Sequence, residues 1–66
     1  MKIIVNNKTT EISSELSLIN LLNKMELIPD TTLVSINDTV ISRNEFENTN
    51  FKENDTVDIF SFVGGG

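Results

Sequence analysis

The sequence predicts an α+β fold: a mixed sheet of four to five strands with one main helix on one face. Short segments rich in β-branched residues, typical of strands, stand at both ends of the chain. Between them, four apolar side chains recur at i, i+3, i+4 and i+7, the spacing of one helix face: Leu18, Leu21, Leu22 and Met25. With a single amphipathic helix, the sheet has one layer against which to bury its apolar face. A chain of 66 residues allows at most one domain.

The first segment predicts a hairpin. Residues 2–6 read as a strand, and residues 9–12 pair back against it as a second strand. The Asn6-Asn7-Lys8 segment between them is a tight turn, because Asn tolerates left-handed backbone geometry.

The helix is expected at about residues 17–26. Ser17 is a plausible N-cap, since its hydroxyl can accept from an orphan backbone N–H of the first turn. Pro29 lies beyond the end and cannot continue the helix.

The second half of the chain predicts three further strands, at 32–36, 40–41 and 56–62. A turn at 37–39, a short helical turn at 42–46 and a loop at 51–55 connect them. We expect Phe46 to face inward and Ser42 or Asn44 to cap its helical turn. We place the last strand in the middle of the sheet, parallel to the first, which is the β-grasp (ubiquitin-like) architecture. The expected core is Ile3, Val5, Leu18, Leu21, Leu22, Met25, Val34, Ile36, Val57 and Ile59.

Composition argues against several functions. The net charge of −5 and the absence of a basic cluster disfavour nucleic-acid binding. No Cys or His is available as a nucleophile, general base or common metal ligand, so an enzyme is not expected. No apolar run reaches the ~18 residues of a membrane span, and the N-terminus lacks a signal-peptide pattern, so we expect a cytoplasmic protein without membrane contact.

Polar residues cluster at two places, Asn37-Asp38 and Glu53-Asn54-Asp55 with Asp58. Carboxylates suit Ca²⁺ or Mg²⁺, but no calcium-loop spacing occurs, and turns need Asn and Asp at such points. We therefore favour turn chemistry and expect no metal site. Arg43 is the only arginine, and it either meets a partner's carboxylate or pairs with an acidic neighbour.

Alternation along the last strand points Val57 and Ile59 toward the helix and Phe60 and Phe62 away from it. Ile4 on the neighbouring first strand points outward too. We expect these three outward side chains to form an exposed apolar patch for partner binding, unless a loop covers them.

The chain ends on Val63-Gly64-Gly65-Gly66, and we expect a body at 1–62 followed by a flexible tail at 63–66. Glycine has no Cβ, and an extended chain covers ~3.3–3.6 Å per residue, so three glycines carry a carboxylate roughly 10 Å outward. Such a tail suits a narrow channel on a partner. The alternative is a frayed terminus.

At this point the chain resembles the ThiS family of sulfur carriers. The residues that carry the resemblance are Ile3-Ile4-Val5-Asn6, Leu21-Leu22, Ile36-Asn37, Val40-Ile41 with Arg43, and the ending Phe60-Ser61-Phe62-Val63-Gly64-Gly65-Gly66. The family often has Val-Pro-Arg where this chain has Ile41-Ser42-Arg43, and Gly-Asp where it has Asn54-Asp55. Both departures are mild.

The resemblance implies that Gly66 is the working residue. A ThiF-type enzyme is expected to adenylate its carboxylate with ATP and Mg²⁺, and a persulfide, from a donor such as a cysteine desulfurase, to convert it to a thiocarboxylate. Thiazole synthase (ThiG) then takes the sulfur. Gly64 and Gly65 thread the tail into both enzymes, with Val63 and Arg43 among the partner-binding residues. The chain itself binds no cofactor on this view.

Two other functions stay open. The chain could be the small subunit of molybdopterin synthase or another thiocarboxylate carrier, which share the fold and the tail. It could also be a ubiquitin-like interaction module whose tail is never activated.

Overall fold

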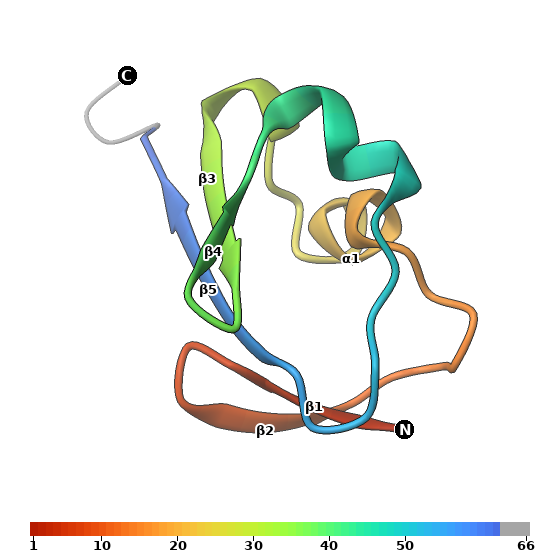
Figure 1. The fold of residues 1–66 in the computed structure, drawn as a ribbon. Helices are drawn as coiled ribbons and strands as arrows, with labels where there is room; N and C mark the ends of the chain where they lie inside the picture. The colour runs from red at the N-terminus through yellow and green to blue at the C-terminus, as the bar shows by residue number, and fades with distance from the viewer. Residues whose placement is uncertain (63–66) are drawn as a thin grey trace.

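A computed structural model describes residues 1–62 of the chain. It shows one mixed sheet with a helix across one face, which confirms the expected fold class (Figure 1). The sheet holds five strands in the order β2-β1-β5-β3-β4. In chain order the elements are β1 (Lys2–Val5), β2 (Lys8–Glu11), α1 (Leu18–Lys24), the 3₁₀ helix η1 (Pro29–Thr31), β3 (Thr32–Ile36), β4 (Thr39–Ile41), the 3₁₀ helix η2 (Arg43–Asn48) and β5 (Thr56–Ser61).

The last strand occupies the centre of the sheet, as the sequence predicts. β5 pairs in parallel with β1, with Ile4 opposite Thr56 and Val5 opposite Val57. On its other side β5 pairs antiparallel with β3 from Ser61 to Val57. β5 therefore continues beyond the end of β1, and its last residues keep β3 as their strand neighbour.

The predicted turns are confirmed, and their backbone explains their composition. Asn6 and Asn7 join β1 to β2 with φ values of 49° and 70°. Asn37 and Asp38 join β3 to β4 with φ values of 52° and 70°, and Asn54 has φ 70° just before β5. These are left-handed conformations that Asn and Asp adopt more readily than other residues with a Cβ.

The helix is shorter than its apolar spacing predicts. Ser17 caps it as expected, its Oγ accepting from the Asn20 N–H at 3.3 Å. At the other end Glu26 takes a left-handed φ of 61°, and the Leu27 N–H donates to the Leu22 carbonyl at 2.9 Å. This 6→1 hydrogen bond ends the helix, so that Lys24 is its last residue and Pro29 opens η1 instead.

Met25 is the one residue of the expected core that the structure leaves exposed. It is the C-cap of α1 and 39% exposed, so its assignment to the core was wrong. The i+7 spacing predicted that Met25 continues the apolar face of the helix, but the helix ends one residue earlier, at Lys24. Ile36 is only partly buried, packed against the core. The observed core is Ile3, Val5, Ile12, Leu18, Leu21, Leu22, Val34, Phe46, Phe51, Val57 and Ile59.

The short helical turn expected after β4 is η2, and Phe46 faces inward from it as predicted. The expected side-chain cap is absent. Ser42 stands at the N-cap position, but its hydroxyl bonds to Asn44 Oδ1 at 2.9 Å and not to a backbone N–H of η2. Within residues 1–62, no helix has the length and apolar character needed to cross a membrane.

Replacing Leu22 by Ala tests this core. Leu22 is 0% exposed, so Leu22→Ala should lower the free energy of unfolding by about 2–5 kcal/mol, a large share of the stability of so small a domain. Urea denaturation followed by circular dichroism measures the loss. Met25→Ala is the matched control and should cost far less. Equal losses for the two variants would show that the helix packs differently.

Candidate functional site

The outer face of the sheet carries two large exposed aromatic side chains near the end of β5. Val57 and Ile59 are buried on the helix side, whereas Phe60 and Phe62 are 60% and 67% exposed. The expected alternation and the expected exposure of both phenylalanines are confirmed. No loop within residues 1–62 covers them.

Leu33 joins these aromatic residues from the neighbouring strand. It lies directly opposite Phe60 in the β3–β5 pairing and is 40% exposed. The Phe62 N–H donates to the Thr31 carbonyl at 2.7 Å, which extends the same pairing one residue beyond β5. Leu33, Phe60 and Phe62 therefore make up one surface, the outer apolar patch, at the end where β5 lies beside β3 (Figure 1).

The structure does not bring Ile4 to this patch, so that part of the prediction was wrong. Ile4 is half-buried and lies opposite Thr56, at the beginning of β5. Phe60 comes four residues later, roughly 13 Å further along the strand. The expectation rested on the faces of the two strands and took no account of how the strands align. In fact β1 ends at Val5, beside the first half of β5.

Arg43 pairs with an acidic neighbour. Its Nε donates to Asp30 Oδ1 at 2.8 Å, and its guanidinium lies 5.4 Å from the centre of the Phe46 ring. Asp30 precedes Thr31, whose carbonyl binds Phe62, so the pair lies at the patch end of the sheet. Both side chains are largely exposed, and such pairs contribute roughly 0–1 kcal/mol.

The acidic clusters are built into turns. The buried Asp55 carboxylate accepts from the Lys52 N–H at 2.7 Å and from Asn37 Nδ2 at 2.9 Å. Asn37 Oδ1 accepts in turn from the Thr56 N–H at 3.0 Å. This network ties the β3–β4 turn to the start of β5. In the part of the chain that the structure describes, no three side chains of metal-binding type come together.

Asn6 takes a role that the sequence analysis did not anticipate. Its Oδ1 accepts from the Ile59 N–H at 2.8 Å, and its Nδ2 donates to the Ile59 carbonyl at 3.2 Å. The carboxamide thus satisfies both backbone groups of Ile59, which the backbone of a longer β1 would otherwise bind. It holds β5 just before the outer apolar patch, at the point where β1 has ended.

The remaining expected site residues, Val63, Gly64, Gly65 and Gly66, lie outside the described residues. The boundary at residue 62 and the flexibility of the tail stay predictions.

The five-stranded sheet with a helix on one face and its last strand at the centre defines a β-grasp domain. The chain belongs to the ThiS family, whose model matches residues 2–66. That match includes the glycine ending and nearly all of the chain.

Two solved structures agree with this assignment. The crystal structure of a thiamine biosynthesis protein (ThiS) from Geobacter metallireducens is 29% identical, with a TM-score of 0.82 and full coverage of both chains. The NMR solution structure of a thiamine biosynthesis protein from the same organism is also 29% identical, with a TM-score of 0.80, over 100% of this chain and 88% of that one. A search of curated proteins found no match. The family and these neighbours support a carrier protein of thiamine biosynthesis.

The Asn6 carboxamide can be tested with a matched pair of variants. Asn6 and Asn7 both have positive φ, which glycine accepts, but only Asn6 bonds to Ile59. Asn6→Gly should lower the free energy of unfolding by about 1–2 kcal/mol and speed hydrogen exchange of the Ile59 amide. Asn7→Gly should do neither. Urea denaturation and NMR-detected exchange measure both, and identical behaviour of the two variants would refute the assigned role.

Proposed function

We propose that this chain is a sulfur carrier for the thiazole ring of thiamine, with Gly66 as the residue that carries sulfur. The observation that supports this most directly is the family match, which continues through the three terminal glycines. The chain lacks Cys and His, so a protein of this composition serves better as a substrate of other enzymes than as an enzyme.

The chemistry requires only a carboxylate from this chain. An ordinary α-carboxyl group has a pKa of ~3.3–3.7, so at pH 7 it is ionised and a poor electrophile. In the proposed route, a carboxylate oxygen of Gly66 attacks the α-phosphorus of ATP on a ThiF-type enzyme, and pyrophosphate leaves. A persulfide sulfur then displaces AMP from the acyl carbon. A thiol then attacks the donor sulfur of the resulting S–S bond and forms a disulfide with it, which releases the thiocarboxylate for thiazole synthase.

The outer apolar patch is the surface that we assign to partner docking. Leu33, Phe60 and Phe62 are exposed together, and Phe62 immediately precedes the tail. An enzyme that binds this patch would hold residues 1–62 close to the point where the tail begins. Because the chain carries a net charge of −5, the matching surface should have an apolar centre and a basic rim. The ThiF-type enzyme and thiazole synthase are the proposed partners, with a cysteine desulfurase as sulfur donor, in the cytoplasm.

The tail is tested by changing its length. Removing Gly66, or appending one alanine after it, should abolish thiocarboxylate formation and leave the melting temperature unchanged, because the core lies within residues 1–62. Incubation with ATP, a ThiF-type enzyme and a sulfur donor, followed by mass spectrometry, detects the exchange of oxygen for sulfur on the intact chain. Normal adenylation of the alanine-extended chain would rule out this mechanism. Transfer of the sulfur to molybdopterin synthase but not to thiazole synthase would contradict the assigned product.

The patch is tested by shortening its aromatic side chains. Phe60→Ala and Phe62→Ala should each weaken binding to the ThiF-type enzyme and to thiazole synthase by about tenfold, since burying a Phe contributes roughly 1.5–3 kcal/mol. Calorimetric titration measures the Kd values. Met25→Ala is the matched control: Met25 is 39% exposed on the helix side of the sheet, away from the patch, and its loss should leave binding unchanged. Equal effects of all three variants would place the docking surface elsewhere.

A further inference from the structure

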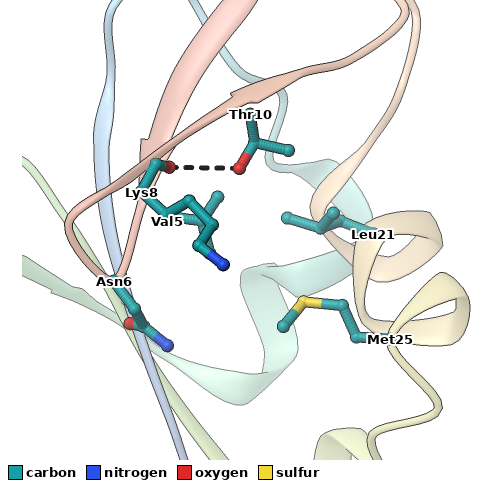
Figure 2. A pocket seen from close by; sticks show the side chains of 6 residues that line it. All are labelled: Val5, Asn6, Lys8, Thr10, Leu21 and Met25. Atoms are coloured by element: carbon teal, nitrogen blue, oxygen red, sulfur yellow. Dashed lines mark hydrogen bonds between the residues drawn. The ribbon is translucent and has the colours of Figure 1, made fainter.

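A concave surface lies on the other side of the sheet from the outer apolar patch, between the β1–β2 hairpin and α1. It is a hollow of about 440 Å³ on the helix side of the sheet (Figure 2). The side chains that line it are Val5, Asn6, Lys8, Thr10, Leu21 and Met25. The outer apolar patch faces the opposite way, so the hollow is separate from the proposed docking surface.

The inner wall of the hollow is apolar. Val5 and Leu21 belong to the buried core and form its floor. Met25 forms the side wall, and Figure 2 shows its thioether directed into the hollow from the end of α1. Met25 is exposed there because the helix ends at Lys24. A thioether is flexible and polarizable, and it adapts to ligands of different shape.

The rim holds one polar group that has no partner among the residues that the structure describes. The Asn6 carboxamide is already bonded to Ile59, and the Thr10 hydroxyl donates to the Lys8 carbonyl at 3.1 Å. Within residues 1–62 the Lys8 ammonium makes no hydrogen bond and no ion pair. Figure 2 shows it reaching over Val5 into the middle of the ring of side chains. No carboxylate lines the hollow, although the chain is acidic overall.

We propose that this hollow binds a small amphipathic monocarboxylate. Its apolar body would lie on Val5, Leu21 and Met25, and its carboxylate would pair with the Lys8 ammonium. The volume stands near the lower end of the ~300–1,000 Å³ typical of small-molecule sites, and an apolar wall with few polar groups is their usual lining. The site is independent of the tail chemistry, so its failure would leave the proposed carrier function untouched.

The competing explanation is that Lys8 merely protects a sheet edge. β2 is an edge strand, and lysines on edge strands discourage pairing with other chains. That explanation predicts no preference for a carboxylate in the hollow.

The test compares one carboxylate with its neutral counterpart. The ¹⁵N-labelled full-length chain is titrated with 4-phenylbutyrate and, separately, with 4-phenylbutyramide, at low ionic strength. We expect amide shifts confined to the hairpin and to the last turn of α1, with a Kd of about 1 mM for the carboxylate. The amide should bind about three- to fivefold more weakly, as an exposed ion pair allows.

Two lysine variants assign the preference to one ammonium group. Lys8→Gln should weaken carboxylate binding about three- to fivefold and leave amide binding unchanged. Lys24→Gln is the matched control, because Lys24 lies in the last turn of α1 but does not line the hollow, and it should change neither affinity. Equal binding of the two compounds to the unmodified chain, or loss of the preference in Lys24→Gln, overturns the proposal. So do shifts confined to Leu33 and Phe60.

Discussion

The parallel pairing of β1 with β5 is the interaction on which the rest of the structure depends. It joins the two ends of the chain, and it sets β5 between β1 and β3. Because β1 stops at Val5, β5 runs on alone on that side and is held there by the Asn6 carboxamide. The last part of the central strand is consequently anchored on both sides, while the side chain of Phe60 on it remains exposed to solvent.

The same pairing gives the sheet two faces with different chemistry. Toward α1, Val57 and Ile59 close the core, and the hairpin leaves a hollow beside the helix end. On the face away from α1, Phe60 lies opposite Leu33, and both side chains are exposed to solvent. The two proposed binding surfaces can therefore coexist on a domain of this size, because they lie on opposite faces of the sheet. A ligand on one face does not obstruct a protein on the other.

Periodicity in the sequence was sufficient to predict which side chains of the last strand point inward, but not how the strands align. The alternation Val57-Asp58-Ile59-Phe60 placed each residue on its correct face, and Phe46 was correctly turned inward. Alternation predicts the face on which a side chain lies but not which residues of two neighbouring strands are level. For this reason Ile4 was assigned to a patch that lies roughly 13 Å from it. Leu33 could have been found, since Val34 beside it was expected to face inward. The helix end depends on the left-handed backbone of Glu26, a residue that does not usually mark such a position, and the Asn6 bonds join residues 53 apart in the chain, so periodicity predicts neither.

The central position of β5 also has a consequence for how the domain folds. The strand that every other part of the sheet is arranged around is the last to be synthesised, and its partner β1 is the first. The hairpin and α1 can form early from local contacts, but they have no complete surface to pack on until residues 56–61 arrive. Contacts between such distant segments require loop closure first, which slows folding. The domain therefore cannot complete its sheet or close its core until β5 has paired with both β1 and β3.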